Sequence, residues 1–277
     1  MTTAVGPSTE QLRTVSDRSA LRKPLVKRTS VRIALPVLVA VAFIAGWELL
    51  SVVGVLNPIM FPPPSEIAVG FAELLPRGYF WEATWITLQE TLLGFAIGTT
   101  FGLVIGALTA TFPVFRTAIY PFVVAFQNTP RVALAPVFLT WFGFGLTSKV
   151  VMAAVICFFP VVINTVAGIA GVDENAKTLF RSMGATRSQT FFRLTLPGAS
   201  AVAFAGVKTA LTLALLGAIV AEFVGASEGL GVLIKELNFQ LEVAKGFAVV
   251  IFLAVIGLIL YGLIELIERR IITWARD

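Results

Sequence analysis

The sequence contains no histidine and only one cysteine, Cys157. Histidine is the commonest transition-metal ligand and the usual general base near neutral pH, so its absence disfavours metal-dependent and histidine-dependent catalysis. A single cysteine inside an apolar run has no partner for an intrachain disulfide. Charged residues are also scarce, at 13% of the 277 residues, so the composition is not that of an ordinary water-soluble globular protein.

Apolar residues are in large excess. They make up 57% of the chain, and the mean hydropathy is +0.90. The solvent for most of the chain is therefore expected to be lipid. The net charge of +5 does not indicate a nucleic-acid partner, because the basic residues lie between the apolar runs instead of forming one patch.

Six apolar runs are long enough to cross a bilayer, since about 20 residues of helix span a hydrocarbon core of about 30 Å. The sequence therefore predicts an all-α integral membrane protein with six transmembrane helices. The expected spans are residues 33–55, 84–111, 117–142, 149–170, 201–225 and 247–267. The third is the least regular, because Pro121, Pro130 and Pro136 each remove a backbone donor.

The positions of lysine and arginine predict the orientation of these spans. With a cytoplasmic N-terminus, fifteen of the 21 Lys and Arg residues fall on the cytoplasmic side and four on the outer side. Arg131 and Lys208 lie within or at the edges of spans. Both termini are thus predicted to be cytoplasmic.

Two regions are expected along the chain. Residues 1–32 are polar and basic, without the apolar segment of a cleavable signal peptide. They are interpreted as a cytoplasmic tail, either solvated near anionic headgroups or, as the alternative, binding a partner. Residues 33–277 form the membrane domain, with a cytoplasmic loop at 171–200.

That loop carries clear helix boundaries. Asp173 is placed to cap a helix that starts at about Glu174, and Gly184 fits the left-handed position that closes it after Met183. Thr186 and Gln189 have capping-box spacing, so they predict a second short helix that Pro197 stops soon after Leu194.

One face of the first helix is apolar. Its stripe consists of Ala176, Leu179, Phe180 and Met183, at helical spacing, while Lys177 and Arg181 lie on another face. Two readings are open at this point. The stripe packs against the protein's own span ends or the lipid interface, or it enters a groove on a soluble partner.

The end of the loop resembles a known family. Binding-protein-dependent ABC importer permeases carry Glu-Ala-Ala, three residues, Gly, nine residues, a hydrophobic residue, any residue, Leu and Pro. Here Gly184 is followed after nine residues by Leu194, Thr195, Leu196 and Pro197, whereas Thr178, Leu179 and Phe180 replace the first half.

The resemblance covers nearly all of the chain after the tail and is closest to permeases of nitrate, sulfonate and taurine type importers. Its short motifs gain specificity only from their order and spacing. They are residues 61–65 (FPPPS), 92–95 (LLGF), 128–131 (NTPR) with 135–136 (AP), 141–143 (WFG), 158–160 (FFP), 164–165 (NT), 221–222 (AE) and 229–231 (GLG).

This resemblance implies the type I ABC importer permease fold in a bacterial inner membrane. It implies a second copy of the permease, two cytoplasmic ATP-binding-cassette subunits and an extracytoplasmic solute-binding protein as partners. The chain itself lacks a phosphate loop, so it is not expected to be an enzyme or to hold a cofactor; ATP and Mg belong to the partner ATPases. The residues implied to couple it to the ATPases are Asp173, Ala176, Leu179, Phe180, Met183, Gly184, Leu196 and Pro197.

Polar groups inside the spans are candidates for the translocation pathway, because lipid cannot satisfy them. The candidates are Gln127, Asn128, Arg131, Asn164 and Glu222. Arg131 either attracts an anion or pairs with a buried carboxylate such as Glu222. Asn164 either lines the pathway or bonds between helices.

Three other ionisable residues, Glu48, Glu90 and Lys208, are placed near span ends, where snorkelling or a simple ion pair is the better explanation. After the fifth span, residues 230–241 have a partly helical pattern, read as an ordinary outer loop or as a short helix over the pathway mouth.

The expected function is inward transport of a small solute, with an anion such as a sulfonate, nitrate or carboxylate favoured. The alternative is a stand-alone channel or secondary carrier, although no internal repeat is evident.

Overall fold

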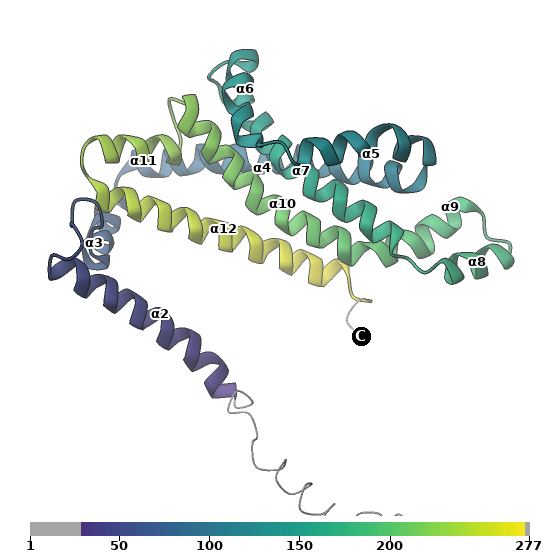
Figure 1. Cartoon of the computed structure of the whole chain (residues 1–277), viewed down its shortest axis with the longest axis horizontal. Helices are drawn as coiled ribbons and strands as arrows, with labels where there is room; N and C mark the ends of the chain where they lie inside the picture. Colours follow the sequence, from purple (N-terminus) through teal and green to yellow (C-terminus); the bar gives the residue numbers. More distant parts are fainter. Residues whose placement is uncertain (1–28, 275–277) are drawn as a thin grey trace, which may run out of the picture. The chain divides into compact units, whose positions relative to one another are not determined.

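The computed structural model describes residues 29–274, which form helices joined by short turns, with no strand in that range (Figure 1). The all-α prediction is confirmed. Most of the tail expected at residues 1–32 lies outside the described residues. The chain divides into two compact units, residues 1–65 and 66–277.

The first unit contains α2 (Thr29–Val52), a long apolar helix that matches the first expected span. Ser51 Oγ donates a hydrogen bond to the carbonyl of Phe61 (2.9 Å) and ties the end of the helix to the turn that follows. The carboxylate of Glu48 accepts hydrogen bonds from the backbone N–H (3.0 Å) and hydroxyl (2.6 Å) of Ser65. Glu48 therefore fixes the chain at the start of α3 (Pro64–Leu74).

The second unit contains the remaining spans. Within residues 29–274, five helices are long and apolar enough to cross a membrane, and a bent pair supplies a sixth crossing if it counts as one span. In the second unit the single-helix spans are α4 (Gly78–Thr111), α7 (Leu146–Ala170), α10 (Leu196–Gly225) and α12 (Val243–Ile271). The α4 and α10 helices begin several residues earlier than the sequence predicted.

The third expected span, 117–142, is not one helix. It consists of α5 (Pro113–Gln127), a 3-10 turn η2 (Arg131–Leu134) and α6 (Ala135–Phe142), and the two arms meet at 95°. Pro130 has no N–H to continue α5 and disfavours a helical conformation at Thr129, so the helix ends at Gln127. Figure 1 shows α6 turning away from the direction of α5.

The core of this unit is α7, which packs along both α4 and α10. Four glycines of α4, spaced by four residues, make the close approach possible: a methyl group added at Gly94, Gly98, Gly102 or Gly106 would meet Ala153, Cys157, Val161 or Thr165 of α7. Small residues let helix backbones approach closely in lipid, where van der Waals packing drives helix association. From the other side, Gly217 of α10 lies against the backbone of Ala153.

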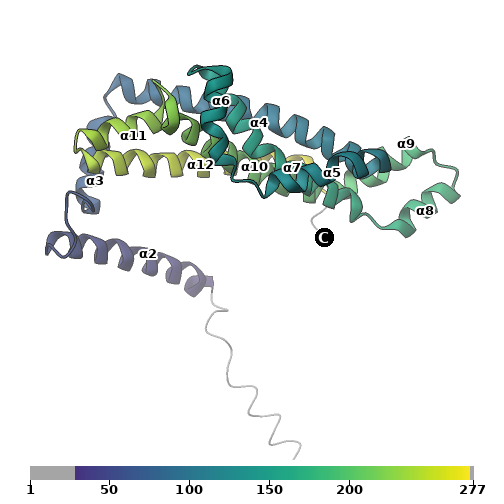
Figure 2. The same ribbon diagram turned by 45° about the horizontal axis from the view of Figure 1, so that its top comes forward.

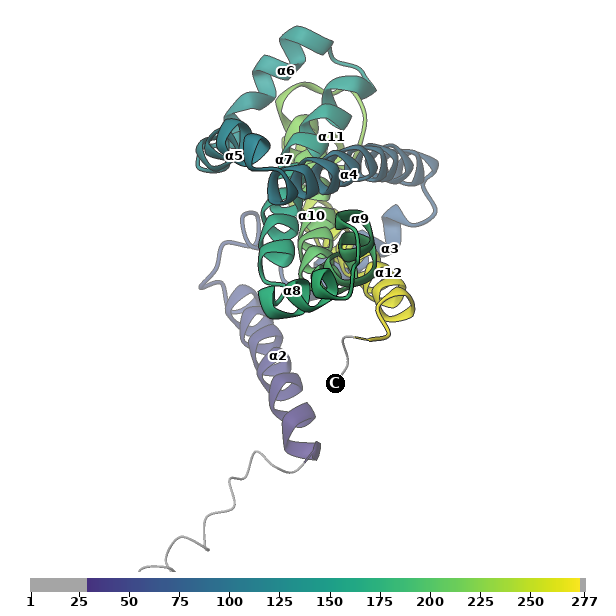
Figure 3. The same cartoon turned by 90° about the vertical axis from the view of Figure 1, so that its right-hand side faces the viewer.

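Two groups of short helices, the α8–α9 hairpin (Glu174–Ser182 and Arg187–Thr190) and α11 (Leu230–Phe239), lie at opposite ends of the second unit (Figures 1 and 2). The short outer helix is thus present close to the expected residues. In the view from the hairpin end, α10 lies among α4, α7 and α12 (Figure 3).

The glycine contact predicts a difference between two alanine substitutions. Gly98→Ala places a methyl group against the carbonyl of Ala154 and the thiol of Cys157, whereas Gly262→Ala on α12 meets nothing within 4 Å. Thermal unfolding of the detergent-solubilised protein is expected to show Gly98→Ala destabilised by about 1–3 kcal/mol. Gly262→Ala should unfold at the wild-type temperature or above it. Equal melting temperatures for both variants would contradict the packing role of the four α4 glycines.

Candidate functional site

The hairpin that joins α7 to α10 is built by local capping. The carboxylate of Asp173 accepts a hydrogen bond from the backbone N–H of Asn175 (2.9 Å), and α8 begins at Glu174 as predicted. The helix ends at Ser182, and Gly184 follows with φ +82°, a left-handed conformation that glycine adopts without strain. The N-cap and the closing glycine are therefore confirmed.

The second half of the hairpin is confirmed at its start but not at its end. Thr186 and Gln189 form the predicted capping box, with bonds of 2.8 and 3.3 Å. The prediction that Pro197 stops this helix is wrong. The chain passes from α9 through a π-helical segment η3 (Phe191–Thr195) into α10, with Pro197 in the first turn of α10.

The helix continues past Pro197 for a physical reason. A proline inside an α-helix collides with the carbonyl four residues before it, and the wider π turn gives that carbonyl room. Residues 187–225 therefore qualify as one helical stretch of 39 residues. The second arm of the hairpin is thus continuous with a membrane span.

The apolar stripe of α8 is only partly covered. Leu179 is 59% and Met183 66% exposed, whereas Ala176 and Phe180 are half-buried. The side chains of Lys177 and Glu174 pair at 2.9 Å. The contacts of α8 with α9 and η3 therefore leave part of the stripe exposed.

The end of the hairpin is tied to the C-terminal segment. The indole N–H of Trp274 donates to the carbonyl of Pro197 (2.9 Å), while Leu196 is 45% exposed. This bond fixes the base of the hairpin at the end of the unit where α12 also ends.

The break between α5 and α6 gathers several of the pathway candidates. Gln127 and Asn128 are exposed at the last turn of α5. Arg131 is half-buried; its guanidinium donates to the carbonyls of Ile156 (3.0 Å) and Gln127 (3.3 Å) and lies 5.3 Å from the ring centroid of Phe159. Within the described part of the chain, no carboxylate forms an ion pair with Arg131.

Glu222 does not pair with Arg131, so that alternative is wrong. Its carboxylate accepts hydrogen bonds from Thr87 Oγ1 (2.6 Å) and from the backbone N–H of Gly231 (2.5 Å). The N–H of Leu230 in turn donates to Thr87 Oγ1 (2.9 Å). Fully buried Glu222 thus holds the start of α11 instead of lining the break.

Glu90 lies beside this network, inside α4 and not at a span end, and it forms an ion pair, one of its two expected explanations, instead of snorkelling. It is fully buried, and Lys149 forms an ion pair with it at 2.5 Å while also donating to the carbonyl of Glu228 (3.3 Å). The cluster Thr87, Glu90, Lys149 and Glu222, here the buried polar cluster, joins α4, α7 and α10.

Sequence reasoning missed Thr87 and Lys149. Thr87, Glu90, Thr91 and Gly94 recur at three- and four-residue spacing, so they share the buried face of α4, and that period was the available signal. Lys208 pairs with Glu268 at 2.6 Å, as one of the two explanations predicted. Asn164 donates to the carbonyl of Pro160 in its own helix (2.8 Å), so it neither bonds across helices nor joins the break.

The structure offers little for covalent or metal chemistry. Among residues 29–274, no three His, Cys, Asp or Glu side chains gather at a possible metal site, and Cys157 is buried. The described chain instead presents two exposed features, the apolar stripe of the hairpin and the polar break between α5 and α6, joined by closely packed helices.

The buried polar cluster predicts a strong effect on stability. Lys149→Met leaves Glu90 buried without its counter-ion and is expected to destabilise the protein by about 3–5 kcal/mol in thermal unfolding. Adding Glu90→Gln should restore part of the loss. Lys177→Met removes a surface pair on α8 and should cost at most about 1 kcal/mol. A Lys149→Met protein as stable as Lys177→Met would show that the buried pair is not formed.

Comparison with known proteins agrees with this arrangement. Residues 98–273 match the family described as the binding-protein-dependent transport system inner membrane component. The putative aliphatic sulfonates transport permease protein of Bacillus subtilis (strain 168) is 33% identical, with 86% of each chain covered. The riboflavin transport system permease protein of Chloroflexus aurantiacus is 37% identical over 78% of this chain and 80% of its own.

Solved structures show the same fold at lower identity. The crystal structure of an amino acid ABC transporter matches with a TM-score of 0.60 and 20% identity, covering 74% of this chain and 97% of that one. An inward-facing methionine ABC transporter matches with a TM-score of 0.53 and 21% identity, covering 73% and 96%. As its loop and span motifs predicted, the chain belongs to the family of binding-protein-dependent transport system inner membrane components, with permeases of the sulfonate and taurine type among its relatives.

Proposed function

We propose that two copies of this chain form the membrane pathway of an ATP-driven importer and that each copy is moved by a cytoplasmic ATPase subunit through the α8–α9 hairpin. An extracytoplasmic binding protein delivers the solute, and ATP and Mg are bound by the ATPases. Nucleotide-driven closure of the ATPases shifts the hairpins and exchanges outward-open and inward-open states.

The exposed stripe of the hairpin is the observation that carries this proposal. Leu179 and Met183 are large apolar side chains left open on a cytoplasmic hairpin, the geometry of a helix that enters a partner's groove. The caps at Asp173 and Gly184 fix where α8 begins and ends. Its continuity with α10 gives a partner's movement a direct route into the membrane.

The break between α5 and α6 supports a pathway between two copies. Exposed Gln127 and Asn128 would be costly in lipid, because hydrocarbon cannot accept or donate hydrogen bonds. A water-filled pathway at the interface with a second copy satisfies them. Arg131 at the same place leaves a positive charge without a carboxylate, which favours a small anionic solute.

The names of the relatives support transport of a small solute, and they differ in which solute it is. They are named for transport of aliphatic sulfonates, taurine and riboflavin. Membership of this family argues against the alternative of a stand-alone channel or secondary carrier.

Coupling predicts a selective loss of transport. Leu179→Asp and Met183→Asp place a charge on the exposed stripe, so the complex with its ATPase should lose at least about tenfold in affinity, as a truncated interface anchor does. The measurement is co-purification with the ATPase and solute uptake into liposomes. Asn175→Asp adds the same charge off the stripe and should transport normally. Unchanged uptake in both stripe variants would overturn the coupling role.

The pathway predicts which positions meet water. Asn128→Cys should react with a membrane-impermeant thiol reagent in the assembled transporter, while Leu258→Cys, 72% exposed on α12, should stay unreactive because lipid covers it. Native Cys157 is fully buried and gives a silent background. Labelling at Leu258→Cys alone would place the pathway elsewhere.

A further inference from the structure

A cavity of about 750 Å³ opens at the end of the second unit opposite the hairpin. One wall comes from the end of α3 and the first turns of α4, and the other from α11 and the start of α12. By the distribution of lysine and arginine, this end faces away from the cytoplasm. Its volume is within the usual range for a ligand-binding pocket.

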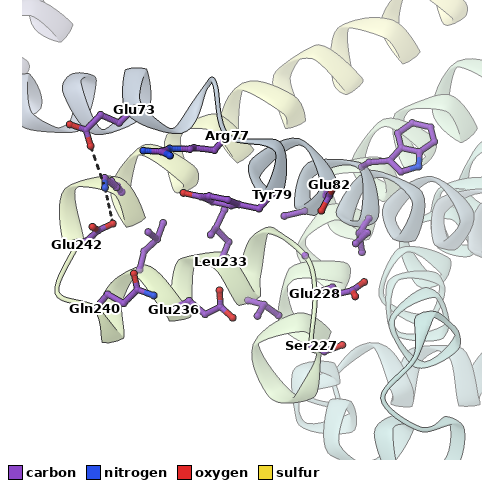
Figure 4. A pocket seen from close by; sticks show the side chains of 17 residues that line it. Glu73, Arg77, Tyr79, Glu82, Ser227, Glu228, Leu233, Glu236, Gln240 and Glu242 are labelled. Atoms are coloured by element: carbon purple, nitrogen blue, oxygen red, sulfur yellow. Dashed lines mark ion pairs between the residues drawn. The ribbon is translucent and has the colours of Figure 1, made fainter.

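The lining of this cavity, here the outer cavity, is strongly acidic. It holds five glutamates against Arg77 and Lys245, a net formal charge of −3. Lys245 is occupied by Glu73 (3.2 Å) and Glu242 (2.9 Å), as the dashed lines of Figure 4 show. Within the described residues, Glu82, Glu228 and Glu236 have no ion-pair partner.

Aromatic side chains accompany the free carboxylates. Tyr79 is 49% and Trp85 59% exposed, and both line the outer cavity. Figure 4 shows Tyr79 and Glu82 on the α4 side opposite Leu233 and Glu236 of α11. Open aromatic rings beside unpaired carboxylates suit a planar guanidinium, which stacks on rings and forms bidentate bonds with carboxylates.

The floor of the outer cavity is fixed to the membrane helices. The carbonyl of Glu228 is bound by Lys149, and the N–H groups of Leu230 and Gly231 are bound by Thr87 and Glu222. Gly229 between them has φ +119°, and an added methyl group would collide with the Glu222 carboxylate. The floor, residues 228–231, is therefore attached to α4, α7 and α10 by its hydrogen bonds to the buried polar cluster.

We propose that the outer cavity seats an arginine-bearing loop of the extracytoplasmic binding protein, so that docking is transmitted to the buried polar cluster. This inference rests on the proposed function, which supplies the binding protein. Charge complementarity selects the occupant. An anionic lipid headgroup is repelled by the net negative charge, and within residues 29–274 no three acidic groups gather closely enough for a metal ion.

The test uses the complete transporter, with its ATPases, in liposomes, and titrates the cognate binding protein while ATP turnover is measured. In the triple variant Glu82→Gln, Glu228→Gln and Glu236→Gln, the concentration for half-maximal stimulation should rise about tenfold at low salt, because the unpaired carboxylates that attract the guanidinium are removed. Added salt should weaken docking of the wild type more than that of the variant. Glu66→Gln, an exposed carboxylate of α3 outside the cavity, should leave the titration unchanged.

A second measurement identifies the occupant and does not depend on the triple variant folding. A photo-crosslinking amino acid at position 79 should attach the purified binding protein, and the attached peptide should contain arginine. Attachment to a peptide without a basic residue, or an unchanged titration in a folded triple variant, overturns the docking site alone. A wild-type transporter that no binding protein stimulates overturns the proposed function and this inference together. Altered solute preference with unaltered docking would assign the cavity to solute and also contradict the inference.

Discussion

The approach of α4 to α7 along four glycines is the contact on which the rest of the structure depends. Lipid gives no hydrophobic gain for bringing apolar helices together, so the association needs dense packing over a long interface. The glycine stripe supplies that interface and brings Thr87 and Glu90 of α4 beside Lys149 of α7 and Glu222 of α10. A buried ion pair tolerates no looser arrangement, because its charges are satisfied only at short range.

Local chemistry made the hairpin predictable from sequence. Asp173, Gly184, Thr186 and Gln189 act on backbone groups within a few residues, so their effects did not depend on the rest of the fold. The same reasoning failed at Pro197, because its outcome depended on the preceding turn. The π segment of residues 191–195 removed the collision that would have ended the helix.

Long-range features were less predictable. Glu90 was placed near a span end because the span was expected to begin at residue 84, but α4 begins at Gly78 and puts Glu90 three turns inside. Its partner Lys149 lies 59 residues away, and no local pattern joins the two. The prolines indicated an irregular third span, but the contacts of Arg131 with Ile156 and Phe159 at the 95° bend involve α7, which no local pattern identifies. The position of the break was readable, whereas its direction was not.

The unbroken run of residues 187–225 also has a mechanical consequence. Thirty-nine residues of helix extend about 58 Å at about 1.5 Å per residue, so the run is longer than the bilayer core is thick. A tilt of about 10° about one end would displace the other by about 10 Å. Glu222 lies near the far end of this run, so a tilt about the hairpin end would give its largest displacement where α11 begins.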